Sequence, residues 1–282
     1  MHAGFSVPAF VSAGKLKRMP RIEHRPVVLT IAGSDSGGGA GVQADLKTFA
    51  TLGIHGTSAV ACITAQNPRR VLRVESCSPK ILQRQIEAVF EELTPAAAKT
   101  GMLFSAENIH VVADFFQKNN RLPLIVDPVM VSTSGARLLK PAAVNALKER
   151  LLPLATLVTP NLREAEILAG LKIANTENMR MAARKIHAHF GCAALVKGGH
   201  LPGVREAVDI FFDDRMEWLL STPFIKGIRT HGTGCTYSAA ITSYLARGLA
   251  LPQAVKHAKE FIFQAIAGSY RIGKHFALNQ QF

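Results

Sequence analysis

The sequence predicts an α/β protein in which a mostly parallel, open sheet lies between two layers of helices. Short apolar runs such as 27–32 alternate along the chain with segments whose apolar residues recur at helical spacing. These runs are continuously apolar, which is typical of parallel strands buried on both faces. Two further runs, 208–212 and 217–224, flank a polar turn and indicate a β-hairpin. The hairpin interrupts the strict alternation that a (β/α)₈ barrel requires, so the open sheet is the favoured arrangement.

The predicted elements follow one another without a break in composition from 26 to 282, so we expect one domain there. The first half holds a strand at 27–32, a glycine loop at 33–41, a helix at 42–52, a strand at 58–65, a helix at 79–93, a strand at 97–103 and a helix at 105–119 with Ser105 as its N-cap. The second half holds a strand at 122–126, a helix at 141–151, a strand at 155–158, helices at 161–169 (closed by Gly170) and 176–190, a strand at 193–196, the hairpin, and helices at 233–249 and 252–271.

Composition narrows the class of protein. Hydrophobic residues make up 48% and charged residues 19% of 282 residues, a globular profile. The longest apolar run, 261–269, is far shorter than the roughly 18 residues of a membrane span. The net charge of +13 is high, yet one Trp and three Tyr offer few rings for base stacking. Small anionic substrates therefore explain the charge better than nucleic acid does, with a generally basic surface as the alternative.

The first 25 residues carry five lysines and arginines against Glu23 and contain no continuous apolar leader segment. We expect residues 1–25 to form a flexible basic extension, in which Met19 is an alternative start. The four cysteines are widely and irregularly spaced with no CxxC pair, which predicts reduced thiols and a cytoplasmic protein.

The glycine loop at 33–41 follows a strand and precedes a helix, which predicts a ligand-binding turn. No Gly-x-x-x-x-Gly in it is followed by Lys and Ser or Thr, so it is not a P-loop. Val42 stands where the dinucleotide fingerprint needs a third glycine. A nicotinamide oxidoreductase is therefore disfavoured.

A second glycine turn, Thr230 to Cys235, runs directly into an apolar helix. Gly232 and Gly234 lack a Cβ and allow a ligand to approach the backbone. The first amides of the helix are unpaired at the positive end of its dipole, which suits a phosphate. A thiol at a helix N-terminus tends to a lowered pKa, so Cys235 is expected to accept a proton. The alternative is a structural cysteine before a core helix.

Polar residues stand where the predicted strands end, and the carboxyl ends of parallel strands share one edge of a sheet. Each has an ordinary alternative reading as a helix cap or a solvated charge, but their common location predicts one site. They are Asp35, Gln66, Asp127, Asn161, Lys197 and the turn around Cys235.

Several motifs together resemble the hydroxymethylpyrimidine/phosphomethylpyrimidine kinases of thiamine biosynthesis, a family of the ribokinase-like superfamily. They are AGSD at 32–35, GGAGVQADLKTF at 38–49, AQN at 65–67, KTGML at 99–103, DPVM at 127–130, TPNLxEA at 159–165, VKGGH at 196–200 and HGTGC at 231–235. The resemblance runs in order from about 27 to 270. It implies a ribokinase-like αβα sandwich and an ATP- and Mg²⁺-dependent phosphorylation of 4-amino-5-hydroxymethyl-2-methylpyrimidine, then of its monophosphate.

The resemblance also implies roles for single residues. In the transfer of phosphate, Cys235 would take the hydroxymethyl proton, and the amides around Gly232 and Gly234 would hold the phosphoryl group. ATP would be bound by Lys197, which reaches its phosphates, and by Thr233 and Asn161. Substrate contacts are expected from Gln66, which would read the aminopyrimidine, and from Met102, Val129 and Asp45. Magnesium is expected at Asp127, Asn161 and Glu164, partly through water.

Two alternatives stay open. Pyridoxal kinase shares the fold and the cysteine, and turnover of both substrates distinguishes it. A non-catalytic pyrimidine-binding regulatory module would bind the ligand without consuming ATP. For the pyrimidine kinase that the resemblance implies, we expect a homodimer whose partners are a small pyrimidine and ATP, not a nucleic acid or a membrane.

Overall fold

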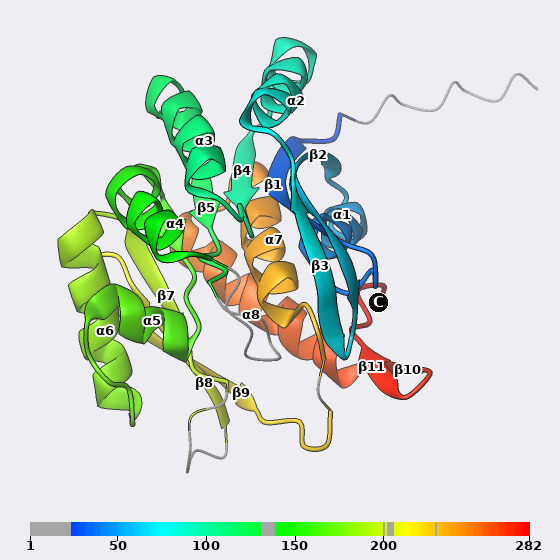
Figure 1. Cartoon of the computed structure of the whole chain (residues 1–282). Helices are drawn as coiled ribbons and strands as arrows, with labels where there is room; N and C mark the ends of the chain where they lie inside the picture. Colours follow the sequence, from blue (N-terminus) through cyan, green and yellow to red (C-terminus); the bar gives the residue numbers. More distant parts are fainter. Residues whose placement is uncertain (1–23, 131–138, 200, 202–205, 229) are drawn as a thin grey trace, which may run out of the picture.

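The computed structural model describes residues 24–130, 139–199, 201, 206–228 and 230–282. Within these residues, nine strands form one open sheet in the order β3-β2-β1-β4-β5-β6-β7-β8-β9 (Figure 1). The six strands from β2 to β7 in this order are parallel, whereas β3, β8 and β9 run antiparallel to their neighbours. The predicted mostly parallel sheet with a hairpin is confirmed. The barrel is excluded because, among the described strands, β3 and β9 are the two edges of the sheet and do not pair with each other.

The strands and helices have the following bounds. The strands are β1 (Val27–Asp35), β2 (His55–Asn67), β3 (Arg70–Ser76), β4 (Ala97–Thr100), β5 (Leu124–Val126), β6 (Leu157–Val158), β7 (Ala193–Lys197), β8 (Glu206–Phe212), β9 (Glu217–Pro223), β10 (Tyr270–Ile272) and β11 (His275–Ala277). The α-helices are α1 (Gly41–Thr51), α2 (Pro79–Glu92), α3 (Ala106–Lys118), α4 (Pro141–Ala146), α5 (Leu162–Ala169), α6 (Thr176–Phe190), α7 (Thr233–Ala246) and α8 (Leu251–Ala267).

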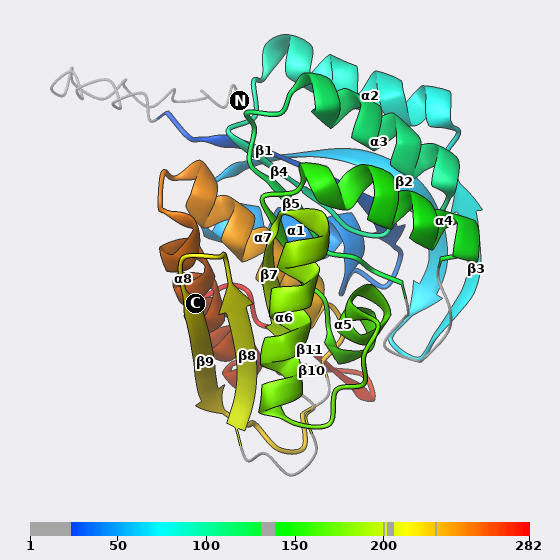
Figure 2. The same cartoon turned by 90° about the vertical axis from the view of Figure 1, so that its left-hand side faces the viewer.

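Helices cover both faces of the sheet because successive strand residues point to opposite sides. On one face, Leu29 and Val126 pack among residues of α2 to α6. On the other face, Ile125 and Leu195 pack against α7 and α8, and Val28 packs near α1. The β8–β9 hairpin extends the sheet beside α6 (Figure 2). The result is three layers, as predicted.

Two β-hairpins differ from the sequence prediction. The expected strand at 58–65 is longer, and β2 turns at Asn67 into β3, an edge strand that the prediction lacks. At the other end, the helix expected to reach Arg271 stops at Ala267, and β10 pairs with β11 through a turn in which Gly273 has φ +56°. A left-handed glycine suits this tight turn.

Two predicted elements are shorter than expected. The helix expected over 141–151 is α-helical only to Ala146 and continues as a π-helix over Leu147–Leu151. Pro153 explains the change, since its ring clashes with the carbonyl of Glu149 in a regular helix. The strand expected over 97–103 ends at Thr100.

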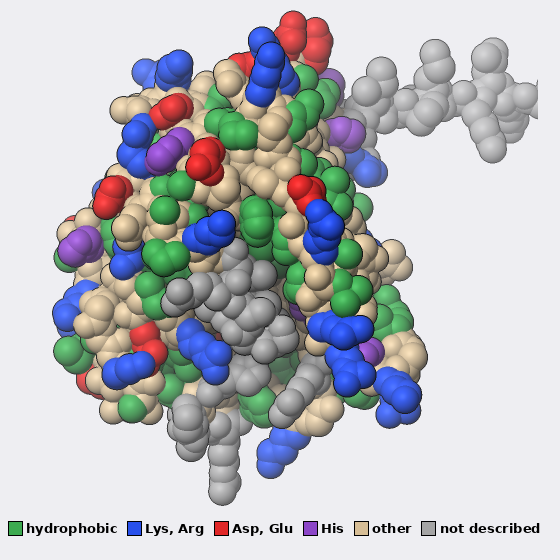
Figure 3. Space-filling view, viewed as in Figure 1, with side chains coloured by type: hydrophobic (Ala, Val, Ile, Leu, Met, Phe, Trp, Pro, Cys, Tyr) green, Lys and Arg blue, Asp and Glu red, His purple; other side chains and the backbone are tan. Residues whose placement is uncertain are grey.

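The distribution of Lys and Arg side chains on the surface agrees with the prediction that the positive charge is spread over the protein. Lys and Arg side chains are scattered over the described part of the face shown in Figure 3 and do not form one continuous band. Within the described ranges, no helix is both long and apolar enough to cross a membrane. The basic extension predicted at 1–25 lies outside the described residues except for positions 24 and 25. His200 of the VKGGH motif also lies outside the described residues.

Candidate active site

The turn before α7 is built by a close contact between two glycine segments. Gly232 has φ +85° and precedes the first residue of α7. A Cβ at Gly232 would lie 1.8 Å from the carbonyl oxygen of Gly39 in the first glycine loop. Only glycine allows both the left-handed dihedral and this approach. The two loops predicted to bind ligand are therefore packed against each other at the N-terminus of α7.

A charged cluster lies beside this turn. The Nζ atom of Lys197 is 3.1 Å from Oδ1 of Asp127. A Cβ at Gly234 would lie 3.2 Å from Lys197 Nζ and 3.5 Å from Asp127 Oδ2. The hydroxyl of Thr159 also donates to Asp127 Oδ1, at 3.3 Å. The ends of β5 and β7 thus bring an ammonium and a carboxylate to the first turn of α7.

Glu164 and Asn161 form a capping box at the start of α5. The Asn161 side chain accepts from the backbone N–H of Glu164, and Glu164 Oε2 accepts from the N–H of Asn161. Glu164 Oε1 also accepts from the N–H of Met130. Burial and the charge of Asp127 raise the pKa of Glu164 to about 7, despite the opposing effect of Lys197. The protonated form of this carboxyl group is therefore favoured more than it is in a solvent-exposed glutamate.

Cys235 lies at this turn as predicted, but its predicted acidity is wrong. The side chain is a free, half-buried thiol. Burial raises the pKa of Cys235 to about 12, although the charge of Lys99 and the N–H of Gly41 oppose the increase. Desolvation of the thiolate outweighs the favourable helix terminus. At neutral pH the resting cysteine is protonated.

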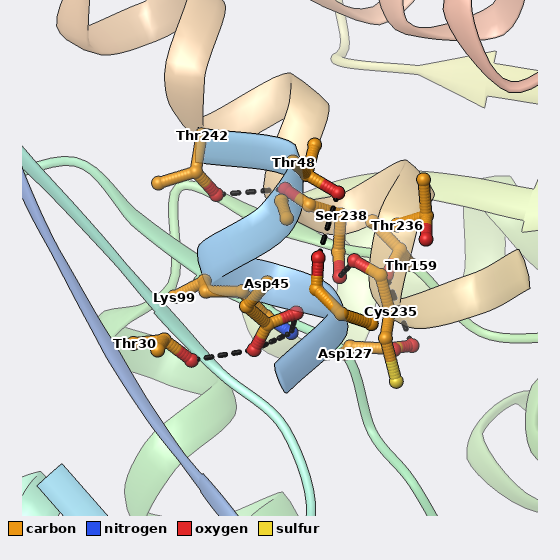
Figure 4. Close-up of polar contacts among 12 residues, drawn as sticks. Thr30, Asp45, Thr48, Lys99, Asp127, Thr159, Cys235, Thr236, Ser238 and Thr242 are labelled. Carbon is orange, nitrogen blue, oxygen red and sulfur yellow. Dashed lines mark hydrogen bonds and ion pairs between the residues drawn. The ribbon is translucent and has the colours of Figure 1, made fainter. Parts of the chain in front are cut away.

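Asp45 and Lys99 form a fully buried ion pair near Cys235. Both side chains are 0% exposed, and Lys99 Nζ lies 2.9 and 3.0 Å from the two carboxylate oxygens of Asp45. Thr30 donates a third hydrogen bond to Asp45, at 2.6 Å. The close-up in Figure 4 shows this pair and Cys235 in one polar group between α1 and α7. Asp45 therefore supports the wall of the site, and Lys99 is a charged residue whose place there the sequence analysis did not recognise.

The other half of the site contains Asp35, Gln66 and His231. Asp35 accepts from the N–H groups of Gly37, Gly39 and Ala40 and so orders the glycine loop. Nε2 of His231 lies 3.2 Å from Asp35 Oδ2 and 2.7 Å from the amide end of Gln66. His231, whose role the sequence analysis also missed, joins the turn before α7 to the end of β2.

The remaining predicted residues lie around these groups. Met102 reaches Gly33, since a Cβ there would lie 2.9 Å from the methionine methyl carbon. Val129 is half-buried and its N–H donates to the carbonyl of Asp127. The Thr233 hydroxyl is 2.9 Å from that of Thr230. The carboxyl ends of the parallel strands thus bring the predicted residues to one edge of the sheet, as expected.

A glycine turn at a helix N-terminus, a lysine and paired carboxylates at the edge of an αβα sandwich define a small-molecule kinase of the ribokinase-like class. The phosphomethylpyrimidine kinase family profile matches residues 35–279. A hydroxymethylpyrimidine/phosphomethylpyrimidine kinase from Rhizobium meliloti is 49% identical over 247 residues, which cover 87% of this chain and 92% of the relative. The chain therefore belongs to the phosphomethylpyrimidine kinase family, and it is a kinase of thiamine biosynthesis.

Other comparisons agree with this family. The thiamine biosynthesis bifunctional protein ThiED of Geobacter sulfurreducens is 47% identical over 250 residues, and the chain spans about half (51%) of its length. The crystal structure of phosphomethylpyrimidine kinase from Clostridium difficile has a TM-score of 0.77 at 45% identity, covering 86% of this chain and 100% of that one. The pyridoxal kinase of Staphylococcus aureus in complex with AMP-PCP and pyridoxal has a TM-score of 0.84 at 34% identity, covering 92% and 94%. The ATP-analogue complex supports the use of ATP by this fold.

Proposed function

We propose that the chain transfers the γ-phosphoryl group of ATP to the hydroxymethyl oxygen of 4-amino-5-hydroxymethyl-2-methylpyrimidine, and then a second phosphoryl group to the monophosphate. One observation carries the proposal. The turn from Gly232 to Cys235 lies between a charged cluster around Lys197 and a hydrogen-bonding side chain, Gln66, suited to a nitrogen heterocycle. An alcohol bound beside Gln66 would therefore face a phosphoryl group bound at the turn.

The phosphoryl group would be held by the backbone of the turn and by Lys197. Because the first N–H groups of α7 have no acceptor within the helix and no side-chain cap, they would bind an anion at the positive end of the helix dipole. Lys197 Nζ is within reach of Gly234, and Thr233 is the first residue of α7, so both would contact ATP phosphates. Phosphoryl transfer depends mainly on such positioning and charge stabilisation.

Magnesium would bind at Asp127 and the capping box of Asn161 and Glu164. Burial and the charge of Asp127 raise the pKa of Glu164, and a divalent cation would relieve this like-charge repulsion. Within the described ranges, no group of three or more His, Cys, Asp or Glu side chains is arranged to hold a metal by itself. Such sparse protein ligation suits Mg²⁺, which keeps waters and binds phosphate oxygens. The ion would neutralise charge on the transferred phosphoryl group.

Cys235 would accept the proton of the hydroxyl group as its oxygen bonds to the γ-phosphorus and the bond from that phosphorus to ADP breaks. The thiol is protonated in the resting protein, so this half-buried group must first release its own proton to solvent water before it can accept the proton of the hydroxyl group. Lys99 and the N–H of Gly41 are the groups that favour the thiolate. Lys99 would thus favour proton loss from Cys235, whereas the charge of Asp45, its buried partner, opposes it.

On the substrate side, Gln66 would hydrogen-bond the aminopyrimidine, since one amide offers donors and an acceptor to a ring nitrogen beside an amine. Met102 and Val129 would pack on the faces of the ring.

The exposed side chains of Ile63 and Leu72, 57% and 60% accessible on β2 and β3, suit burial in a homodimer. The four free cysteines suit a reducing cytoplasm. Within the described residues, one nine-stranded sheet takes its strands from 27 to 223, and α7 and α8 pack on it, which supports one kinase domain preceded by a basic extension.

Pyridoxal kinase is the competing function, because a pyridoxal kinase structure has a TM-score of 0.84 to this chain, against 0.77 for the phosphomethylpyrimidine kinase structure. The identity of 45% to a phosphomethylpyrimidine kinase, against 34% to a pyridoxal kinase, favours the pyrimidine. The test is kcat/KM of the purified protein with each alcohol and ATP. We expect the pyrimidine to be preferred by at least about tenfold, which corresponds to about 1.4 kcal/mol of transition-state binding. A large preference for pyridoxal would overturn the substrate assignment.

A further inference from the structure

The orientation of the Gln66 amide is determined by a neighbour on another loop. The backbone N–H of Gln66 donates to the hydroxyl of Ser36, which in turn donates to the carbonyl of Gln66, both at 2.8 Å. The amide end of the side chain, with Nε2 nearest, lies 2.7 Å from Nε2 of His231. A side-chain amide turned by 180° exchanges nitrogen and oxygen with nearly the same shape. Hydrogen bonding therefore decides which atom faces the histidine and which faces the substrate.

Asp35 shows which hydrogen bond is made. Its Oδ2 accepts from the N–H groups of Gly39 and Ala40 and lies 3.2 Å from Nε2 of His231. Burial acts to raise the pKa of Asp35, but hydrogen bonds from His231 and the loop amides outweigh it, so the pKa is lowered. Asp35 is therefore ionised at neutral pH. A bare nitrogen lone pair of His231 facing this carboxylate would be repelled, whereas an N–H would be attracted.

The Nε2 atom of His231 therefore carries a proton, and this proton determines which end of the Gln66 amide faces the histidine. The single Nε2–H group lies within reach of both Asp35 Oδ2 and the Gln66 amide and is shared between them. An N–H group cannot accept a hydrogen bond, so the Gln66 atom that faces it must be the acceptor, Oε1. A separation of 2.7 Å is short but reasonable for N–H···O and too short for two N–H groups. The NH₂ group of Gln66 then points away from His231 and is available to the substrate.

We propose that His231 is a positioning residue for substrate selection: held by Asp35, it fixes the Gln66 amide so that NH₂ faces the ligand and donates to a ring nitrogen of the aminopyrimidine. This proposal rests on the role of Gln66 given above. The same histidine directly precedes Gly232, and its Cδ2 would lie 3.3 Å from a Cβ at Gly39. The residue that orients the pyrimidine reader is thus part of the turn assigned to the phosphoryl group.

The first test measures the tautomer directly and does not need activity. Long-range ¹H–¹⁵N spectra of histidine-labelled protein at pH 8, without substrate, report which ring nitrogen carries a proton. The His231 signals are assigned by their absence in His231→Phe. We expect a proton on Nε2. A His231 protonated only on Nδ1 would overturn the proposal.

The second test reverses the group that faces the substrate. Gln66→Glu keeps an oxygen for His231 but replaces NH₂ by a second acceptor, so KM for the pyrimidine at pH 8 should rise at least about tenfold with a smaller change in kcat. An unchanged KM would show that an oxygen already faces the ring and would overturn the proposal. His231→Phe should lower the ratio of kcat/KM for the pyrimidine over pyridoxal at least about fivefold. A ratio in His231→Phe equal to that of the wild type would also contradict the proposed positioning role of His231.

A matched control separates this inference from the proposed function. His110 is exposed on α3, so His110→Phe should keep both KM and the substrate ratio within about twofold of the wild type. If the wild type consumes no ATP with the pyrimidine, the proposed function fails, while the spectra still report the tautomer of His231. If the wild type is active and His231 is protonated on Nδ1, only the present inference fails.

Discussion

Replacing Gly232 by Ala should break the contact between the two glycine loops, and a matched glycine gives the reference. Gly232 and Gly248 have almost the same dihedral, φ +85° and +87°. A Cβ at Gly248 would meet nothing within 4 Å, whereas one at Gly232 would lie 1.8 Å from the carbonyl oxygen of Gly39. Both variants incur the left-handed cost of about 1–2 kcal/mol. Only Gly232→Ala adds a steric clash.

The size of the clash sets the expected effect. A carbon–oxygen contact needs roughly 3.3 Å, so the two loops must part by about 1.5 Å in Gly232→Ala. We expect this variant to lose at least about 2 kcal/mol more unfolding free energy than Gly248→Ala, within the range for added strain and overpacking. Displacement of the turn by more than 1 Å should also lower kcat about 10²-fold.

The assay combines urea unfolding with steady-state ATP consumption for the wild type and both variants. Gly248 follows the last residues of α7, far along the helix from the turn, so its variant should keep kcat near the wild-type value. If the two variants have unfolding free energies within about 0.5 kcal/mol of each other and Gly232→Ala turns over normally, the packing of the two loops is not what builds the site.

Three further predictions concern single side chains. Cys235→Ala should lower kcat at least about 10²-fold with little change in KM, as expected for a lost proton acceptor, and wild-type turnover would rule that role out. Gln66→Leu should raise KM for the pyrimidine most, because ring polar atoms lose their partner, and unchanged affinity would exclude Gln66 as the reader. Because the pKa of Glu164 is raised to about 7, its contribution to stability is complete below about pH 4.5 and is lost as pH rises through 7. Urea unfolding in EDTA should therefore show about 1–3 kcal/mol less stability at pH 8 than at pH 5 from this group, and Glu164→Gln should flatten that slope; an equal slope in both proteins would contradict the assignment.

The sequence predicts that the polar residues of the site lie close together, because the carboxyl ends of the strands share one edge in a parallel sheet. Asp127 and Lys197 stand far apart in the chain, yet both directly follow or end an apolar run, and the structure joins them at 3.1 Å. The cap at Asn161 and the left-handed Gly170, with φ +62°, were equally local signals. Patterns of this kind depend only on neighbours in sequence and on one rule of topology.

The chemistry of Cys235 could not be predicted because it depends on tertiary burial. The helix terminus is a local feature and favours the thiolate, but desolvation by burial, which depends on the tertiary fold, outweighs it. Lys99 did leave a signal, a charge in an otherwise apolar strand, but its partner Asp45 is on a different element. The sequence pattern did not predict the hairpin of β10 and β11, because Tyr270 continues the apolar spacing of α8. Gly268 and Gly273 mark the turns of this hairpin.

The central claim is that this site moves phosphate from ATP onto an alcohol of an aminopyrimidine and then onto the resulting monophosphate. The most direct measurement is ³¹P NMR of the purified protein with ATP, Mg²⁺ and 4-amino-5-hydroxymethyl-2-methylpyrimidine over time. We expect the phosphomonoester to appear first and the diphosphate to follow, with one ADP formed for each phosphoryl group transferred. A spectrum in which ATP persists, or in which it is hydrolysed to free phosphate without a pyrimidine ester, would contradict the claim.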